Sequence, residues 1–237
     1  MPSPVRYPSG ITNNSPTDIM RNLITLDESK YIRFFDDFYG YTAANWINTV
    51  TQAGSGSATA TLPDELGGSL LITNDNADND NSFFQWCGAS ASVTECFKFV
   101  AGKQLWFSSR LKVSDATQCD FVMGLQITDT SPLAVSDGVY FIKNDDAATL
   151  DLVVTKASTA TTVAAISTIV SDTYVTLEYY YDGKSTIEYG INGAVLGAAD
   201  TTNMPNTQTL ALSFGIQNGA AAIKTMNIDY ILVIQER

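Results

Sequence analysis

Hydrophobic and polar residues alternate along most of this chain. The period of two is clearest from Lys103 to Val113, in KQLWFSSRLKV, and from Asp172 to Tyr181, in DTYVTLEYYY. Successive side chains of a β-strand point to opposite faces, so this alternation predicts strands with one buried and one polar face. From Tyr31 onward the pattern predicts strands near residues 31–38, 45–51, 57–62, 68–73, 82–87, 95–99, 103–113, 119–128, 138–144, 149–156, 162–169, 173–182, 184–191, 194–198, 208–217 and 223–236.

Two dipeptides, Asp182-Gly183 and Asn192-Gly193, divide the segment from Tyr179 to Gly197. Both tolerate the positive φ angles of tight hairpin turns, so the segment reads as three short antiparallel strands. About fifteen strands at short spacing, without an internal helical pattern, predict two packed antiparallel sheets. Since β-sandwiches of this size are commonly one domain, we assign residues 27–237 to a single jelly roll. An aromatic strand that ends in Asp-Gly, followed by a strand that ends in Asn-Gly, resembles the back-sheet meander of concanavalin A-like jelly rolls.

Residues 1–26 follow a different pattern. Pro2, Pro4, Pro8 and Pro16 interrupt them, and no strand alternation is present. The sequence Ser-Pro-Thr-Asp at 15–18 has the form of a helix N-terminus and predicts a short helix in an extended arm. The chain has no run of about 18 apolar residues and no apolar stretch near residue 1, so we expect neither a membrane span nor a secretion signal.

The composition narrows the classes of partner. Hydrophobic residues make up 45% of the chain and charged residues 16%, which provides a large core. The formal net charge is −12, and residues 34–97 contain no Lys or Arg. Phosphate binding depends on Lys and Arg, so we expect the folded part to bind neither nucleic acid nor anionic membranes.

The chain contains no histidine. Ser-His-Asp and Cys-His catalytic pairs are therefore excluded, as is a zinc site with histidine ligands. Laminarinase-like glycosidases carry their catalytic carboxylates on one strand as Glu-x-Asp-x-Glu, and this chain lacks that triplet. Glu178 and Glu188 lie on adjacent predicted strands and could face each other, but we interpret them as a pair on a solvated surface. We expect no enzymatic activity and no cofactor.

Two further groups of residues have both a structural and a chemical interpretation. Asp75, Asp78 and Asp80 could supply oxygen ligands to Ca²⁺, but the spacing is not that of an EF-hand, and a solvated acidic turn is the preferred interpretation. Cys87 and Cys96 bracket a predicted excursion that a disulfide could close, although three free thiols, with Cys119, fit a reducing cytoplasm better.

Aromatic residues are candidates for contact with a sugar or a protein partner. The candidates include Trp46, Trp86 and Trp106, of which Trp86 and Trp106 lie in strongly apolar strands and are expected in the core. In Tyr179, Tyr180 and Tyr181, alternation is expected to leave at least one ring exposed. Asp229, in a predicted closing strand, is expected to anchor a turn or to meet Lys224 or Arg237.

Several sequence blocks resemble known proteins. The segment PVRYPSGITN at 4–13 is similar to the N-terminal arms of structural proteins of tailed bacteriophages. A further set of blocks resembles phage and prophage proteins with a concanavalin A-like, laminin-G-type jelly roll: FDDF at 35–38, DAT at 115–117, FVMGLQITDT at 121–130, YDG at 181–183, SFGIQNG at 213–219 and DYIL at 229–232.

The resemblance implies a non-enzymatic virion protein made in the bacterial cytoplasm. It would decorate the outer capsid, bind the major capsid protein and stabilise the shell, with a trimer as the favoured state. The expected capsid contacts in the arm are Arg6, Tyr7, Pro8, Ile11 and Met20. The alternative is a glycan-binding adhesion module that contacts a host glycan through Tyr179, Tyr180 or Tyr181, and a polysaccharide-cleaving enzyme ranks last.

Overall fold

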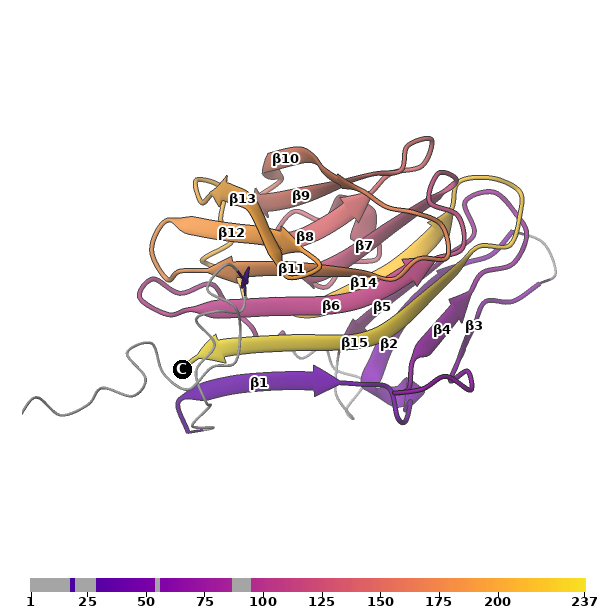
Figure 1. Cartoon of the computed structure of the whole chain (residues 1–237), viewed down its shortest axis with the longest axis horizontal. Coiled ribbons are helices and arrows are strands. Elements are labelled where there is room, and N and C mark those ends of the chain that lie inside the picture. Colours follow the sequence, from indigo (N-terminus) through magenta and orange to yellow (C-terminus); the bar gives the residue numbers. More distant parts are fainter. Residues whose placement is uncertain (1–17, 20–28, 54–55, 87–94) are drawn as a thin grey trace, which may run out of the picture.

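Two antiparallel β-sheets lie one behind the other in the computed structural model, which describes residues 18–19, 29–53, 56–86 and 95–237 (Figure 1). Sheet I contains, in spatial order, β13 (Ala194–Asp200), β12 (Thr186–Ile191), β11 (Val175–Tyr181), β6 (Leu105–Val113), β15 (Thr225–Glu236), β4 (Leu70–Thr73) and β3 (Thr59–Thr61), and β1 (Tyr31–Asp36) also pairs with β15. Sheet II contains β10 (Thr159–Thr168), β9 (Thr149–Lys156), β8 (Gly138–Lys143), β7 (Cys119–Gln126), β14 (Ala211–Asn218), β5 (Asn81–Trp86) and β2 (Trp46–Thr51). The predicted all-β sandwich is confirmed.

Most predicted strands are present within a few residues of their expected bounds. The segment at 95–99 is an exception, because Phe97 forms only an isolated bridge with Leu210. Two short 3-10 turns, η2 (Ala43–Asn45) and η4 (Pro132–Ala134), lie in the described part of the chain, and Ile19 also has 3-10 conformation. No helix among the described residues is long and apolar enough to cross a membrane.

The two predicted turns differ in length. Asn192 and Gly193 join β12 to β13 with φ angles of 53° and 84°, which confirms a two-residue hairpin turn of the type that Asn-Gly favours. After Asp182-Gly183 the next strand begins only at Thr186, so this connection is longer than expected. Its conformation is held by Asp182, whose carboxylate accepts the backbone N–H groups of Lys184, Ser185 and Thr186.

The core lies between the sheets and is rich in aromatic rings. On the sheet I side, Phe107 and Tyr179 stack with their centroids 4.8 Å apart. On the sheet II side, the ring of Phe214 lies 5.4 Å from Phe84 and 4.9 Å from Trp46. These rings come from alternate positions of their strands, so the alternation in the sequence places them on the inner faces.

Two residues of the predicted N-terminal arm are described. Asp18 forms an isolated bridge with Ala194, and Ile19 is fully buried against Trp106, Tyr180 and Ile234 on the outer face of sheet I. At these residues the chain packs on its own body. The proposed capsid contacts Arg6, Tyr7, Pro8, Ile11 and Met20 lie outside the described residues, and the division at residue 26 stays a prediction.

Candidate functional site

The outer face of sheet II has an apolar floor. It is formed by Phe83 on β5, Val122 on β7, Tyr140 and Ile142 on β8, and Val153 on β9, all at most 8% exposed. Glycines make room for the two rings: a Cβ atom at Gly215 would lie 2.5 Å from Cδ1 of Phe83. Burial raises the pKa of Tyr140 to about 12, so the phenol is neutral throughout the physiological range.

The loop between β7 and β8, residues 127–137, covers this floor. Its side chains Leu133 and Val135 pack on the apolar cluster. Two buried amides hold its backbone: Gln85 Nε2 donates to the carbonyl of Ile127 (3.1 Å), and Gln126 Nε2 donates to that of Pro132 (2.9 Å). Because each amide lies on a central strand, the loop is fixed relative to the sheet.

A pocket of about 210 Å³ remains between this loop and the edge of sheet II. It is lined by Thr51, Asn81, Phe83, Thr130, Ser131, Pro132, Leu133 and Gln217. Its described lining carries no formal charge, and the pocket therefore fits a neutral polar ligand. Phe83 adds an aromatic surface at its base.

Hydrogen-bonding groups in the pocket are partly preorganised. Asn81 Oδ1 accepts the backbone N–H of Thr51 (3.1 Å), and Gln217 Nε2 donates to Asn79 Oδ1 (3.2 Å), which fixes both amide orientations. The hydroxyls of Thr51, Thr130 and Ser131 have no hydrogen-bond partner among the described residues. Each can therefore donate to and accept from a ligand hydroxyl.

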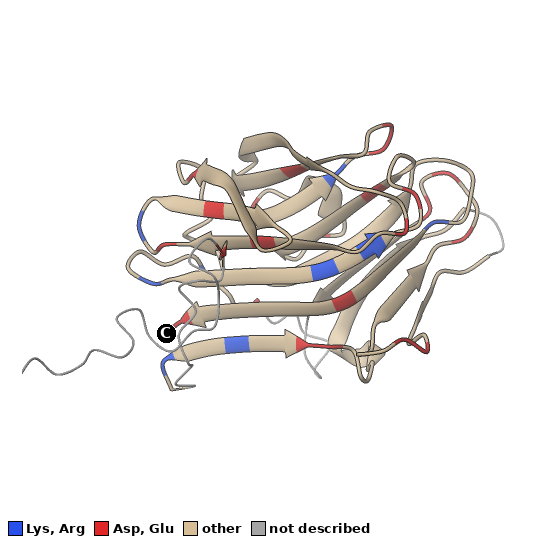
Figure 2. Ribbon diagram, in the orientation of Figure 1, with Lys and Arg blue, Asp and Glu red and all other residues tan. Residues whose placement is uncertain are grey.

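The outer face of sheet I differs in chemistry, with cations and carboxylates on adjacent strands (Figure 2). Arg110 on β6 forms an ion pair with Asp229 on β15, and its guanidinium lies 4.1 Å from the ring centroid of Tyr174. The expectation that Asp229 meets Lys224 or Arg237 is wrong. The β15 register places Arg110 beside Asp229, and Lys224 pairs with Asp115 (2.6 Å).

Glu65 connects the β3–β4 loop to this network. It accepts hydrogen bonds from the Tyr174 hydroxyl (2.9 Å), Asn227 Nδ2 (2.8 Å) and the Ser69 hydroxyl (3.0 Å). Partial burial opposes ionisation of Glu65, but these bonds outweigh it and lower its pKa. The members of this cluster lie up to 162 residues apart, so no local sequence pattern predicts it.

The three tyrosines proposed as glycan contacts are all buried. Tyr179 and Tyr181 face the core. Tyr180 points to the outer face of sheet I but is only 5% exposed, because it stacks on Trp106 with centroids 5.3 Å apart and lies under Ile19. The expectation of an exposed tyrosine is wrong, since alternation specifies the face of a residue and not what covers that face.

Glu178 and Glu188 share the outer face of sheet I, as the strand pattern predicted. In the β11–β12 register Glu178 is opposite Gly190 and Glu188 is opposite Tyr180, so the two carboxylates are diagonal neighbours. Glu178 is buried rather than solvated, and burial raises its pKa despite a hydrogen bond from the backbone N–H of Gly193 (2.8 Å).

The acidic loop at 75–80 has a structural role at one of its three carboxylates. Asp80 is fully buried and accepts the backbone N–H groups of Ala53 (2.6 Å) and Ala77 (3.1 Å). Among the described residues, Asp75, Asp78 and Asp80 do not form a group that could hold a metal ion. Asp80 is thus a turn-forming residue, one of the two interpretations of this segment.

Cys96 and Cys119 are free thiols in the structure, and Cys119 is buried. Burial raises the pKa of Cys119 to about 12, which makes it unreactive in the folded state. Cys87 lies outside the described residues.

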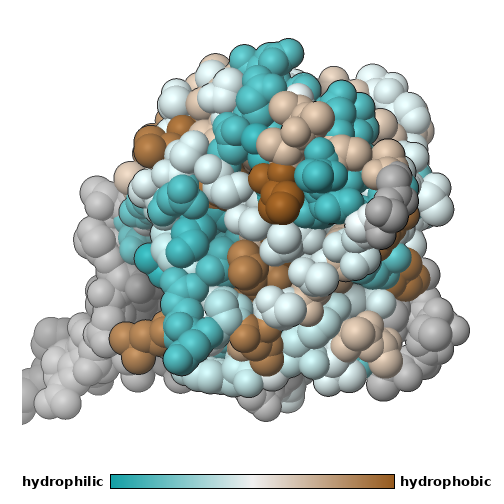
Figure 3. Space-filling view, turned by 90° about the vertical axis from the view of Figure 1, so that its right-hand side faces the viewer, coloured by the Kyte–Doolittle hydropathy of each residue, from teal (hydrophilic) through white to brown (hydrophobic). Residues whose placement is uncertain are grey.

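Of the tryptophans, Trp46 is only 6% exposed and packs edge-on against Trp86 at 5.1 Å, while Trp106 is 1% exposed. Trp46 therefore does not supply an exposed ring. The exposed large apolar side chains include Leu66, Val170 and Ile223, all in loops. At the end of the molecule seen in Figure 3, hydrophobic residues form separate spots among hydrophilic ones.

Comparison with known proteins identifies the fold class. No protein-family profile and no curated protein sequence matches the chain. Solved structures do match: a glycoside hydrolase of family 16 from Bacteroides ovatus has a TM-score of 0.60 at 10% identity, covering 84% of this chain and 98% of that one. Peanut lectin has a TM-score of 0.52 at 14% identity, covering 87% and 97%. A Shewanella oneidensis protein of unknown function has a TM-score of 0.58 at 16% identity, covering 87% of both chains.

The fold is therefore a concanavalin A-like jelly roll, as expected. The same matches correct the expectation of a non-enzymatic protein. Several of the matching structures are family 16 glucanases, so the fold is one that enzymes share. The lack of histidine and of a Glu-x-Asp-x-Glu strand does not exclude glycan cleavage.

Proposed function

We propose that the chain binds glycans and that the pocket beside Phe83 holds a neutral sugar ring. The observation that carries this proposal is the uncharged lining of the pocket, with hydroxyls and amides beside an aromatic ring. Sugars combine hydroxyl groups with apolar C–H faces, which matches such a lining. Support also comes from the matching structures, which include glucanases and a lectin.

The size of the pocket sets the expected affinity. Its volume of about 210 Å³ is below the roughly 300–1,000 Å³ of sites for drug-sized ligands, so one sugar unit is held and the rest of a chain extends outside. At about −0.3 kcal/mol per non-hydrogen atom, a ring of about 12 such atoms gains roughly 4 kcal/mol, equivalent to a dissociation constant of about 1 mM.

Titration of the ¹⁵N-labelled protein with mixed-linkage β-glucan oligosaccharides tests the proposal. We expect saturable shifts at the backbone amides of Thr51, Ser131 and Gln217. The double variant Thr130→Ala and Ser131→Ala removes two open hydroxyls and should weaken binding about tenfold. Thr162→Ala, exposed on β10 at the opposite edge of sheet II, is the control. Absence of saturable binding, or an unchanged affinity in the double variant, would reject the pocket.

A second assay on the same samples measures cleavage. The protein is incubated with mixed-linkage β-glucan, and the reducing ends released over time are counted. Release above that of the buffer, lost in the double variant, would add catalysis to binding.

The narrower role implied by the sequence resemblance, a trimeric virion protein that decorates the capsid and binds the major capsid protein, stays a proposal. It rests on the sequence blocks quoted above. Co-sedimentation with undecorated capsids is its test, with a fixed number of bound copies per capsomer as the expected result. If no protein sediments with the capsids even at a large excess, this role is rejected, while glycan binding stays open.

A further inference from the structure

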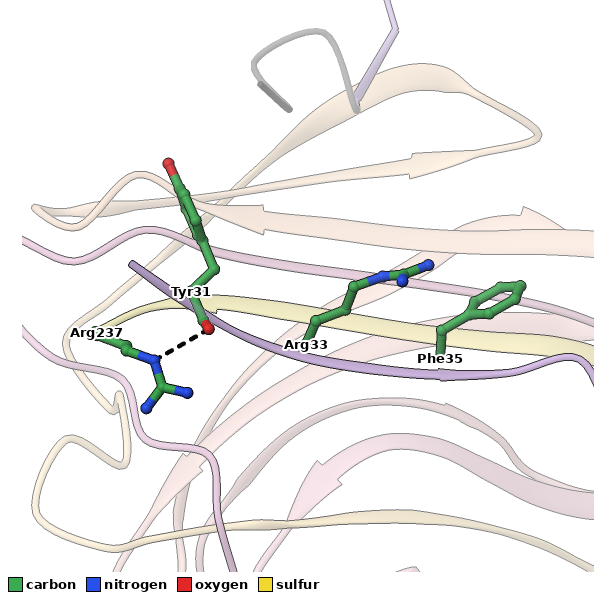
Figure 4. A pocket seen from close by; sticks show the side chains of 4 residues that line it. All are labelled: Tyr31, Arg33, Phe35 and Arg237. Atoms are coloured by element: carbon green, nitrogen blue, oxygen red, sulfur yellow. Dashed lines mark hydrogen bonds between the residues drawn. The ribbon is translucent and has the colours of Figure 1, made fainter. Parts of the chain in front are cut away.

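A second candidate site lies on the opposite sheet, where β1 pairs with the C-terminal half of β15. Two adjoining hollows of about 420 and 390 Å³ share Tyr31 and Arg237. The larger is also lined by Arg33 and Phe35 (Figure 4), and the smaller by Ser29, Lys30, Gly102, Lys103 and Glu236. Together they form what we name the β1 groove, defined by these residues.

The β1 groove is positively charged in an acidic protein. Among the side chains of its described lining are four cations, Lys30, Arg33, Lys103 and Arg237, and one carboxylate, Glu236, whereas the whole chain carries a net charge of −12. The side chain of Glu236 is held by the backbone N–H of Gln104, which donates to its Oε2 (2.8 Å), and its single charge offsets one of the four cations. The groove thus presents an excess of positive charge to a ligand.

Arg33 has capacity for an anionic ligand. It forms no ion pair within the described part of the chain. Its guanidinium makes a cation–π contact, 5.2 Å from the ring centroid of Phe35. A guanidinium has five N–H donors in a planar fork that matches a carboxylate. In Figure 4 the side chains of Arg33 and Phe35 extend alongside each other from β1.

The other walls of the groove are held in place. Arg237 Nε donates to the carbonyl of Tyr31 (3.1 Å), shown by the dashed line in Figure 4. The ring of Tyr31 packs against buried Trp106, with centroids 6.3 Å apart. Phe35, in contrast, is 47% exposed although it is a large apolar ring. A guanidinium beside an exposed aromatic ring, as Arg33 is beside Phe35, is suited to a carboxylate carried on a ring with an apolar face.

We propose that the β1 groove binds the uronate units of an acidic polysaccharide. The sugar carboxylate pairs with Arg33, and the C–H face of the pyranose ring packs on Phe35. Lys103 in the adjoining hollow serves the carboxylate of the next unit. The acidic body repels the remainder of a long polyanion, so the groove engages a short stretch of the polymer. This site is separate from the neutral pocket on sheet II and does not depend on it.

Calorimetric titration with two matched tetrasaccharides tests the proposal. The first is β-1,4-linked glucuronate, and the second is cellotetraose, which has the same backbone with hydroxymethyl groups in place of carboxylates. We expect the wild-type protein to bind the glucuronate tetramer and to bind it less tightly as salt is raised, because exposed charges are screened. Cellotetraose should not bind at the β1 groove.

Variants locate the binding. Arg33→Ala should weaken glucuronate binding about tenfold or more, since hydrogen bonds to charged groups are strong. Phe35→Ala should weaken it less, and Lys184→Ala, which removes an exposed cation from the β11–β12 loop, should have no effect. Thermal melting of each variant confirms that it is folded, and Arg33→Lys, which keeps the charge but not the fork, should restore binding only in part.

Three outcomes would overturn the proposal. They are equal affinity for the two tetrasaccharides, equal loss in Arg33→Ala and Lys184→Ala, and binding of tetraglutamate as tight as that of the glucuronate tetramer. The last result would mean that the groove responds to charge alone and fits an acidic peptide.

Discussion

Individual charged residues buried in this protein are stabilised by different kinds of partner. Lys143 is fully buried and donates to the backbone carbonyls of Thr117 (2.9 Å) and Cys119, and burial lowers its pKa. Glu178 accepts hydrogen bonds from a hydroxyl and a backbone N–H. Lys224, in contrast, has a carboxylate partner in Asp115. Of these three residues, Lys224 is the one held in an ion pair with a carboxylate, and the strength of that pair depends on pH in the acid range.

The Asp115–Lys224 pair predicts loss of stability in acid. The hydrogen bond from Lys224 lowers the pKa of Asp115 to about 2, whereas an unfolded Asp titrates near 3.9. A lowered pKa stabilises the fold above the unfolded value, and this contribution disappears as the pH falls from about 4 to about 2. Asp115→Asn keeps the side-chain oxygen that accepts the N–H groups of Thr117 and Gln118. It should lower the free energy of unfolding by about 1–2 kcal/mol at pH 7.

Urea denaturation at pH 7, 4 and 2.5 measures this effect. The difference between wild type and Asp115→Asn should shrink steadily as the pH falls. Asp64→Asn, in the exposed β3–β4 loop, controls for the loss of one negative charge. A difference that persists undiminished at pH 2.5 would show that the pair does not account for the stability.

At the scale of elements, the outer face of sheet II depends on glycines in its central strands. Gly215 on β14 lies beneath the ring of Phe83, which forms both the apolar floor and the base of the neutral pocket. The loop at 127–137 is then fixed above this floor by Gln85 and Gln126. Strand, ring and loop thus form three layers, each of which supports the next.

Gly215→Ala should disturb all three layers. The new methyl group would lie 2.5 Å from Phe83 Cδ1 and 2.6 Å from Phe83 Cα, so the ring and its strand must shift. Overpacking of this kind costs about 1–3 kcal/mol of unfolding free energy. Sugar binding in the neutral pocket should weaken as well. Gly40→Ala is the matched control, because nothing lies within 4 Å of a Cβ atom there. Equal melting temperatures for the two variants would contradict the layered arrangement.

Strands were easier to predict from the sequence than the contacts between residues distant in the chain. Alternation in the segments around Trp106 and Tyr180 correctly predicted strands, because side-chain period is a local property. It did not reveal that Ile19 covers both rings, nor that Arg110 pairs with Asp229 across 119 residues of sequence. The neutral pocket depends on how the loop at 127–137 folds back, which no local pattern specifies. Such contacts follow from strand order and register.

On the scale of the whole molecule, one core supports two chemically different outer faces. The floor of sheet II is apolar and borders an uncharged pocket, while the outer face of sheet I carries ion pairs and the cationic β1 groove. The two sheets meet through aromatic rings: Tyr179 on β11 lies 6.0 Å from Phe141 on β8, and Phe34 on β1 lies 4.9 Å from Trp86 on β5. Phe214 belongs to the same buried cluster. A substitution that removes packing from this core is therefore expected to destabilise both sheets, and with them both outer faces.

Phe214→Ala should destabilise both sheets. The residue is fully buried, and removing such a ring costs about 3–5 kcal/mol. Hydrogen exchange should show a similar loss of protection in β11 of sheet I and in β7 of sheet II. Tyr39→Ala, at a position 80% exposed, should change the unfolding free energy by less than about 0.5 kcal/mol. Lost protection confined to sheet II would show that the sheets unfold separately.

The pairing of β1 with β15 also has a consequence for biosynthesis. Residues 31–36 find their ladder partners only at residues 231–236, and β6 and β4 also need β15 to become neighbours. While the ribosome makes the intervening chain, the aromatic strand β1 has no edge to join, and sheet I stays incomplete. Sheet I can therefore close only after β15 has left the exit tunnel, because the pairings of β1, β4 and β6 with β15 are all non-local.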